Sequence, residues 1–190
     1  MKLIIASNNK HKIYEIKKIL GTRFDEILSL REAGIDHETV EDGTTFMENA
    51  LKKAREIAEI SGECALADDS GISADALGGE PGIYSARYSG GHGNDEENNK
   101  LLIKKLADKE DKSAHYTAAI ALVYPDGREV TAEGYMYGRI IDTPRGERGF
   151  GYDPIFVPVG EERTVSEMTD EEKNAISHRA RGLAALLEKL

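Results

Sequence analysis

The chain opens with a short apolar run that is followed at once by an amphipathic segment. Residues 3–6 are all apolar, and apolar residues then recur at positions 13, 16, 19 and 20, just before Gly21. The run predicts a buried strand, and the spacing predicts a helix that ends at the glycine. A strand that leads directly into a helix is typical of an α/β fold, in which helices cover a sheet.

Later segments extend this pattern into a mixed sheet. We expect a second short strand over 27–30, and a long strand over 116–124 that turns near Gly127 into an antiparallel partner over 129–137. Helix starts are predicted from two capping boxes and two capping residues, which are Thr45 with Glu48, Thr169 with Glu172, Asp95 and Ser177.

A polar turn, Ser7-Asn8-Asn9-Lys10-His11-Lys12, joins the first strand to the first helix. Free N–H groups at a helix start, the helix dipole and two lysines together favour binding of an anion. The turn lacks the glycines of a Walker loop, so it matches no standard nucleotide motif. The alternative is an ordinary Asn cap with solvated lysines.

Two adjacent carboxylates follow another buried strand candidate, Cys64-Ala65-Leu66-Ala67. Asp68, Asp69 and Ser70 come next, and we expect Gly71 to fix a turn there. Side chains alternate between the faces of an extended chain, so both acids cannot point into one pocket if the strand continues through them. We therefore expect one acid to be a site residue and the other to be structural. The alternative is plain turn chemistry, in which Asp and Ser bond to their own backbone.

An acidic turn, Val40-Glu41-Asp42-Gly43, lies just before the helix that Thr45 caps. Mg²⁺ prefers one or two carboxylates together with waters and phosphate oxygens, so one of these acids is a candidate partner of Asp69 in a metal site. We favour Glu41, although spacing does not choose between Glu41 and Asp42. The alternative is that both acids simply stabilise the positive end of the helix dipole.

Two further features lie in the last third of the chain. Phe150, in the glycine-rich stretch 144–154, can present the face of its ring to a nucleobase; the alternative is a hydrophobic anchor. His178 and Arg179 follow Ser177 in the first turn of the last predicted helix. Cations there oppose the helix dipole, which indicates an anionic or carbonyl partner, and the alternative is an exposed, solvated pair.

The overall charge argues against one class of partner. The 35 acidic residues outnumber the 25 basic ones, and the formal net charge of −10 disfavours a duplex-binding surface, so we expect no nucleic acid partner. A local cluster of Lys and Arg can still hold a small phosphorylated substrate. We find no signal-like or transmembrane run and expect a cytoplasmic protein without a membrane partner. The 190 residues suit one domain, or two lobes that share a core.

Six blocks between Ser7 and the final helix form an ordered series. They are Ser7-x-Asn9-x-x-Lys12-x-x-Glu15, Thr45-Phe46-x-Glu48-Asn49-Ala50, Ala67-Asp68-Asp69-Ser70-Gly71, Pro81-Gly82-Ile83-Tyr84-Ser85-Ala86-Arg87-Tyr88, Gly149-Phe150-Gly151-Tyr152-Asp153-Pro154 and Ser177-His178-Arg179. This series resembles the inosine/xanthosine triphosphate pyrophosphatase family, also described as dITP/XTP pyrophosphatases or Ham1-like proteins.

The resemblance implies both a fold and a reaction. The fold would be α/β, with an elongated mixed β-sheet flanked by helices, in a single domain over residues 1–190 whose two lobes hold the substrate in a cleft. The reaction would be hydrolysis of deaminated purine nucleoside triphosphates (ITP, dITP and XTP) to the monophosphate and pyrophosphate. The resemblance also implies Mg²⁺ as cofactor and a homodimer as the assembly.

The same resemblance assigns the site residues. Asp69 would be the catalytic acid and a metal contact, with Glu41 as the second metal carboxylate. The substrate contacts would be Ser7, Asn8, Asn9, Lys10, His11 and Lys12 around the triphosphate, Ser70, and then Phe150, Gly151, Tyr152, Asp153, Lys173, His178 and Arg179 around the base and sugar.

Two alternatives to this function remain at the level of the sequence. The first is a nucleotide pyrophosphatase of broader base specificity, which would give the same products. The second is a nucleotide-binding regulator without catalysis, against which the joint presence of Lys12, Glu41 and Asp69 argues.

Overall fold

The structure is a computed structural model that describes all of residues 1–190, and its strands form one six-stranded sheet in the order β2-β1-β3-β4-β5-β6. The strands are β1 Lys2–Ile5, β2 Glu26–Ser29, β3 Cys64–Ala74, β4 Ser113–Val123, β5 Glu129–Ile140 and β6 Phe156–Pro158. The helices are α1 Lys10–Leu20, α2 Phe46–Ser61, α3 Asp95–Leu106, α4 Asp170–Ile176 and α5 His178–Leu187. β1 is parallel to β2 and β3, whereas β6 is antiparallel to β5. The predicted mixed α/β fold is therefore confirmed.

Contacts divide the chain into two compact units. The first consists of Met1–Asp69, Ala118–Gly134 and His178–Leu190, and the second of Ser70–Thr117 and Tyr135–Ser177. The expected cleft between two lobes stays a prediction.

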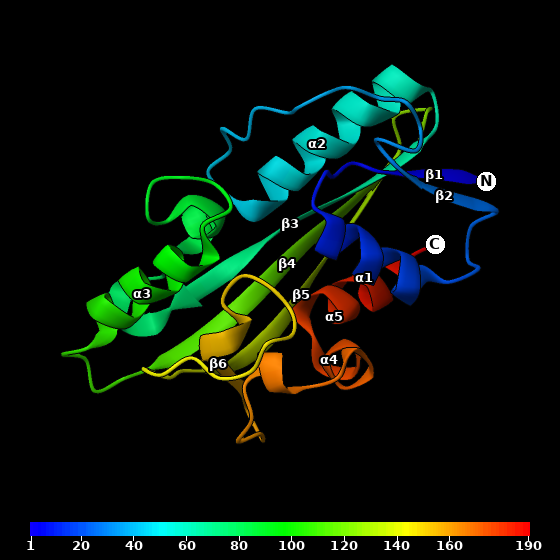
Figure 1. Cartoon of the computed structure of the whole chain (residues 1–190). Helices are drawn as coiled ribbons and strands as arrows, with labels where there is room; N and C mark the ends of the chain where they lie inside the picture. The colour runs from blue at the N-terminus through cyan, green and yellow to red at the C-terminus, as the bar shows by residue number, and fades with distance from the viewer. The chain divides into compact units, whose positions relative to one another are not determined.

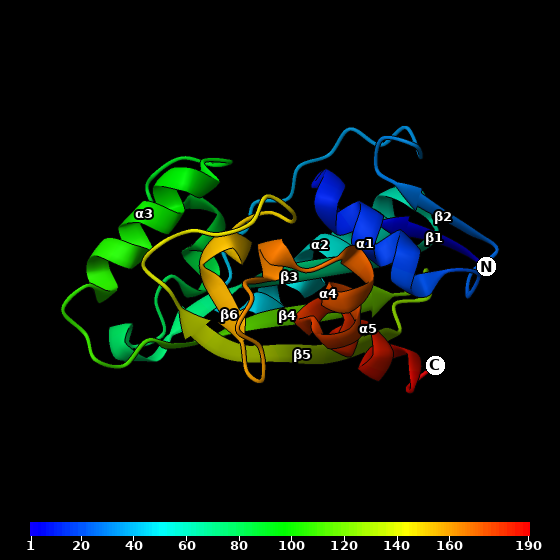
Figure 2. The ribbon, with the colours of Figure 1, turned by 60° about the horizontal axis from the view of Figure 1, so that its bottom comes forward.

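In the first unit, alternate residues of β1 enter two separate cores. Leu3 and Ile5 pack in one cluster with residues of α1 and α5, whereas Ile4 packs in another with residues of α2. α2 therefore covers one face of these strands (Figure 1), and α1 and α5 lie side by side on the other (Figure 2). This arrangement decides which helix each side chain of β3 can reach in this unit.

The second unit has a core of its own. Ile72 at the far end of β3 lies in one buried cluster with Leu102 of α3 and Phe156 of β6. Tyr116 of β4 packs edge-on against Phe156, with 4.9 Å between the ring centroids. Tyr152 belongs to the same cluster, so the core anchors the glycine-rich stretch that contains Phe150.

Several helix boundaries follow the signals in the sequence. Asn9 caps α1, and Gly21 ends it with a positive φ of 55°. The predicted capping box of Thr169 and Glu172 is present at the start of α4. None of the helices combines the length and the apolar character that crossing a membrane requires.

One of two further caps differs from the prediction. Thr45 accepts the N–H of Glu48 as expected, and the Glu48 carboxylate accepts hydrogen bonds from the N–H and hydroxyl of Thr44. The cap of α3 is Asn94 and not Asp95, because the Asn94 side chain accepts an N–H from the first turn. Asp95 is thereby left as the first helical residue, with its carboxylate available for another contact.

Candidate active site

β3 passes through the two adjacent acids without turning. The predicted turn at Gly71 is wrong, because Asp68, Asp69 and Gly71 all lie inside the strand Cys64–Ala74. The chain stays extended there because the residues after the acids, beginning with Ile72, are buried in the second unit's core. As alternation requires, Asp68 contacts α1 and α5, and Asp69 contacts a lysine of α2.

Asp68 faces two cations in a buried environment. Lys12 Nζ lies 2.6 Å from Asp68 Oδ1, and Arg179 donates from Nε and Nη2 at 3.2 and 3.3 Å. Burial by itself would raise the pKa of Asp68, but Arg179 and Lys12 outweigh it and hold the pKa well below its usual range. Asp68 is a buried carboxylate that the protein neutralises with its own cations.

Arg179 is held on both sides by carboxylates. Its side chain is 1% exposed; Nη1 donates to Glu15 of α1, while Nε and Nη2 donate to Asp68. The alternative of an exposed, solvated pair at the start of α5 is wrong, because His178 and Arg179 are both buried. The protein itself supplies anionic partners to Arg179, and the contact of His178 and Arg179 with a base stays a prediction.

On the other face of the strand, Asp69 shares a lysine with Glu41. Lys53 Nζ lies 2.6 Å from Glu41 Oε1 and 3.3 Å from Asp69 Oδ1, and it also donates to the Asp68 carbonyl oxygen at 2.9 Å. Burial raises the pKa of Asp69 despite the neighbouring lysines, with Glu41 and Asp68 adding to the increase. Burial would lower the pKa of Lys53, but Asp69 and Glu41 raise it overall. Lys53 is therefore a fixed cation between two acids.

The surroundings of these two acids suit a divalent metal. Glu41 and Asp69 converge on the same Lys53 ammonium group, and Asp69 Oδ2 is buried without a hydrogen-bond partner. Two carboxylates with a spare oxygen match the ligand preference of Mg²⁺. Asp42 instead pairs with Lys52 at 2.7 Å, so the geometry favours Glu41, as the sequence analysis did.

The predicted triphosphate turn is partly occupied by its own contacts. Asn9 Oδ1 accepts the N–H groups of His11 and Lys12 at 3.0 and 3.2 Å, and the Asn9 N–H donates to Ser7. Two N–H groups that we expected to be free for an anion are therefore already paired. The Asn cap is confirmed, but the Lys12 side chain is only 14% exposed and is not a solvated lysine.

In the second unit, Asp153 gathers the residues expected near the base. Its Oδ1 accepts from the Tyr116 hydroxyl at 2.9 Å, and its Oδ2 accepts from Lys173 Nζ at 2.9 Å and from the Phe150 N–H at 3.2 Å. Lys173 Nζ also lies 4.8 Å from the centroid of the Phe150 ring. Phe150, Asp153 and Lys173 are thus one contiguous group. Ser70 is a half-buried residue of β3.

Glycine is required on both sides of Phe150. Gly149 has a φ of 76°, and a Cβ there would lie 2.3 Å from Asp153 Oδ2. Gly151 has a φ of 61°, in the left-handed region that other residues adopt at a cost. The two glycines let the backbone fold around the Asp153 carboxylate while Phe150 projects between them.

Sequence reasoning missed Lys53 and Glu15. Lys53 occupies the apolar stripe of α2, between the buried residues Ala50 and Ile57. A charged residue within such a stripe is a signal that it has a buried partner. Glu15 of α1 is buried as well, but its place in the sequence carries no such signal, because adjacent residues of a helix do not share a face.

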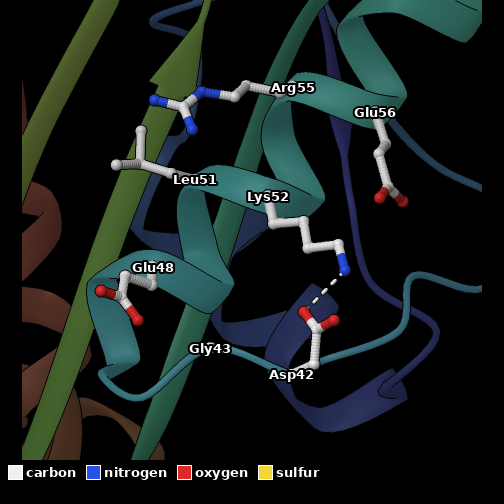
Figure 3. A pocket seen from close by; sticks show the side chains of 7 residues that line it. All are labelled: Asp42, Gly43, Glu48, Leu51, Lys52, Arg55 and Glu56. Atoms are coloured by element: carbon white, nitrogen blue, oxygen red, sulfur yellow. Dashed lines mark hydrogen bonds and ion pairs between the residues drawn. The ribbon is translucent and has the colours of Figure 1, made fainter.

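A hollow of about 580 Å³ lies along α2 (Figure 3). It is lined by Asp42, Gly43, Glu48, Leu51, Lys52, Arg55 and Glu56. Arg55 pairs with Glu129, and Glu56 accepts hydrogen bonds from His37 and Thr39. Because the charged groups already have protein partners, we do not assign the site to this hollow.

A model of the Ham1 family matches residues 3–189. This chain belongs to the Ham1 family. Among curated Ham1 relatives, a "dITP/XTP pyrophosphatase" of Clostridium perfringens is 49% identical over 197 residues, which cover 100% of this chain and 97% of the relative. Another of that name from Leifsonia xyli is 49% identical over 193 residues, covering 100% of this chain and 96% of the relative.

Solved structures of Ham1 proteins have the same fold. The Staphylococcus aureus Ham1 protein matches with a TM-score of 0.88 at 38% identity, over 100% of this chain and 99% of that one. A HAM1 protein of Coxiella burnetii matches with a TM-score of 0.89 at 36% identity, over the whole of both chains. The family assignment thus agrees with the resemblance carried by the sequence blocks.

Proposed function

We propose that the protein hydrolyses deaminated purine nucleoside triphosphates, such as ITP, dITP and XTP, to the nucleoside monophosphate and pyrophosphate. The observation that carries this proposal is the 49% identity, across this whole chain, to a curated dITP/XTP pyrophosphatase. The acids and lysines of the first unit support it, because hydrolysis of a triphosphate depends on positioned charges around the phosphates.

Asp69 is the proposed acceptor of a proton from water. Release of intact pyrophosphate requires water to attack the α-phosphorus, and the phosphorus–oxygen bond to the leaving pyrophosphate then breaks. Asp69 Oδ2 has no hydrogen-bond partner, and the raised pKa of this buried carboxyl makes it a stronger base than an exposed Asp. General-base help is typically worth about 10²–10⁴-fold in rate, so charge neutralisation and positioning must supply the rest.

Lys12 is the proposed cation for the phosphates, and Lys53 is the proposed support of Asp69. Lys12 is held by Asp68, and Lys53 is held by Asp69 and Glu41, so carboxylates fix both ammonium groups before a substrate binds. Charges that are already oriented stabilise a transition state without the cost of reorganising them. We propose that Lys12 contacts the triphosphate and that Lys53 holds Asp69 in place.

Mg²⁺ belongs to the proposal as the cofactor, with Glu41 and Asp69 as the residues that would hold it. When bound, the ion would neutralise phosphate oxygens of the triphosphate. The shared position of the two carboxylates on Lys53 supports this assignment.

Recognition of a 6-keto purine is assigned to hydrogen-bond donors. The Lys173 ammonium group carries N–H donors that suit the O6 acceptor of hypoxanthine or xanthine, whereas adenine presents an amino donor at that position. A site built to hydrogen-bond its substrate can reject an analogue without that group by about 10⁴–10⁵-fold. The position of Lys173 over the Phe150 ring supports its assignment to the base.

We extend the proposal to a cytoplasmic homodimer, which the family resemblance alone supports. Sedimentation equilibrium of the purified protein tests the assembly, since a dimer has twice the mass of the 20.9 kDa chain.

Isotope labelling tests the chemical step. ITP is hydrolysed in ¹⁸O-labelled water, and both products are analysed by mass spectrometry. Label in the inosine monophosphate with unlabelled pyrophosphate is the expected result, because water attacks the α-phosphorus. Label in pyrophosphate, or release of orthophosphate and inosine diphosphate, would refute the proposed reaction.

A further inference from the structure

Helix α3 holds the residue that follows Phe150. The Gly151 N–H donates to Asp95 Oδ2 at 2.8 Å, and Asn99 Nδ2 donates to the Gly151 carbonyl oxygen at 3.2 Å. Asp95 and Asn99 are four residues apart, so they lie on the same face of α3. One helix thus binds both peptide groups of a single glycine.

We propose that Asp95 and Asn99 are positioning residues for nucleobase recognition. They fix the backbone at Gly151 and thereby the ring of Phe150 and the carboxylate of Asp153. This inference rests on the proposed function, because it concerns the segment assigned there to the base. Neither residue belongs to the sequence blocks that carry the family resemblance.

The segment needs an external support because of its glycines. Gly149 and Gly151 flank Phe150, and both have positive φ values. Glycine loses more conformational freedom on ordering than any other residue. A stretch with two glycines therefore has a flexible backbone unless other groups restrain it. Two hydrogen bonds from a regular helix supply that restraint, with Asn99 buried at 7% exposure.

Asn99 has an energetic cost that packing alone does not explain. Its Oδ1 is buried without a hydrogen-bond partner, and an unsatisfied buried acceptor costs about 1–3 kcal/mol. A leucine of similar size would avoid that cost but could not donate to Gly151. The donor function of Asn99 is therefore the property that the site uses.

The neighbouring residue holds a second segment from the same helix. Asn98 Nδ2 donates to the carbonyl oxygens of Ser85 and Ala86, and Asn98 Oδ1 accepts the Ser89 N–H at 2.8 Å. The Tyr152 hydroxyl also donates to the Ser85 carbonyl oxygen at 2.7 Å. The start of α3 is thus the common support of residues 85–89 and 150–153.

The test compares Asn99→Leu and Asp95→Ala with the unmodified protein. We measure kcat and KM for ITP and for ATP, and the affinities for inosine monophosphate and for inorganic tripolyphosphate. We expect KM for ITP to rise and inosine monophosphate to bind about 10-fold more weakly, as the loss of one hydrogen bond predicts, with unchanged tripolyphosphate affinity. The ratio of ITP to ATP efficiency should fall by a similar factor.

Two controls separate positioning from folding. Glu96→Gln alters an exposed residue of the same helix that pairs with Lys100, and it should change none of these quantities. Asp95→Asn keeps an oxygen that accepts the Gly151 N–H and should restore most of the selectivity lost in Asp95→Ala. Asn99→Leu removes an unsatisfied oxygen but also the hydrogen bond to Gly151, so its melting temperature should stay close to that of the unmodified protein.

The outcomes distinguish this inference from the proposed function. Unchanged inosine monophosphate affinity and an unchanged ITP to ATP ratio in both variants would overturn the positioning role. An unmodified protein that is inactive on ITP would refute the proposed function instead. In that event inosine monophosphate affinity and hydrogen exchange of the Gly151 amide still decide the role, with faster exchange expected in Asp95→Ala.

Discussion

At the scale of residues, two neighbouring acids of one strand have opposite electrostatic environments. Asp68 contacts Lys12 and Arg179, which lowers its pKa. Asp69 has to share Lys53 with Glu41, and burial raises its pKa. Alternation of side chains along β3 therefore separates a neutralised structural carboxylate from a basic one with a spare oxygen.

Asp69→Asn should reduce turnover at least about 10²-fold, because the amide keeps the shape but cannot accept the proton. In the unmodified protein the pKa of folded Asp69 lies above the unfolded value of 3.8, so the charged Asp69 carboxylate lowers the stability of the fold at neutral pH. The melting temperature should therefore not fall. Turnover and calorimetry on one preparation check both points, with Asp42→Asn as the matched control that should leave turnover unchanged. Normal turnover in a folded Asp69→Asn protein would remove Asp69 from the mechanism.

Asp68→Asn should act mainly through stability. Lys12 and Arg179 would both lose their contact with a buried carboxylate, and breaking a buried ion pair typically costs about 3–5 kcal/mol. Urea unfolding at neutral pH measures this loss. Glu26→Gln is the control, since the exposed pair of Glu26 with Lys2 should change stability by less than about 1 kcal/mol. Equal stability of the Asp68→Asn and control proteins would contradict the assignment of Asp68 as a structural residue.

Tyr116 should make the protein sensitive to high pH. Burial, followed by the nearby Asp153, raises its pKa well above 10.0, so the folded state keeps a proton that the unfolded chain releases. The contribution of protonated Tyr116 to the free energy of unfolding is fully present below pH 10. Above pH 10 the free energy of unfolding should fall by about 1.4 kcal/mol per pH unit. Unfolding free energies between pH 9 and 11 measure the slope. Tyr116→Phe should flatten it, and an equal slope in both proteins would show that Tyr116 does not stay protonated.

At the scale of elements, close packing of β5 against α5 places the buried cations. A Cβ at Gly134 of β5 would lie 2.1 Å from the His178 carbonyl oxygen and 2.2 Å from the Gly182 nitrogen of α5. No side chain larger than hydrogen fits between this strand and the helix start. The absence of a side chain at Gly134 thus allows the start of α5, with His178 and Arg179, to lie directly against β5.

Gly134→Ala should destabilise the first unit, because the added methyl group meets backbone on the facing helix. Overpacking of this kind typically costs about 1–3 kcal/mol, and the cost can exceed that where backbone must move. Thermal unfolding measures the change. Gly91→Ala is the matched control, since a Cβ there meets nothing within 4 Å. Equal melting temperatures of the two variants would show that β5 and α5 have room between them.

Local signals predicted elements better than they predicted the contacts between them. Caps at Asn9, Thr45 and Thr169 depend on neighbours in the sequence, and those helix starts were predictable. The path of β3 beyond Asp69 depends on burial against residues far along the chain, so its turn was predicted wrongly. The pairing of Arg179 with Asp68 spans 111 positions and has no local signal.

At the scale of the whole molecule, the predicted site residues fall into two groups, each within its own compact unit. The first unit contains Lys12, Glu41 and Asp69, with Lys53 as the residue that the sequence did not reveal. The second contains Phe150, Asp153 and Lys173 in mutual contact. The residues of both groups were predictable from the sequence, but the contact of Lys53 with both Glu41 and Asp69 depends on the fold.

The most direct test of the proposed function is a comparison of ITP, XTP and ATP under identical conditions with Mg²⁺, measuring pyrophosphate and orthophosphate separately. We predict pyrophosphate and the monophosphate as products, with kcat/KM for ITP and XTP far above that for ATP, because donors in the site suit an O6 acceptor. Comparable kcat/KM for ITP and ATP would contradict recognition of deaminated purines and favour a pyrophosphatase of broader specificity. Orthophosphate as the first product would contradict the pyrophosphatase reaction itself.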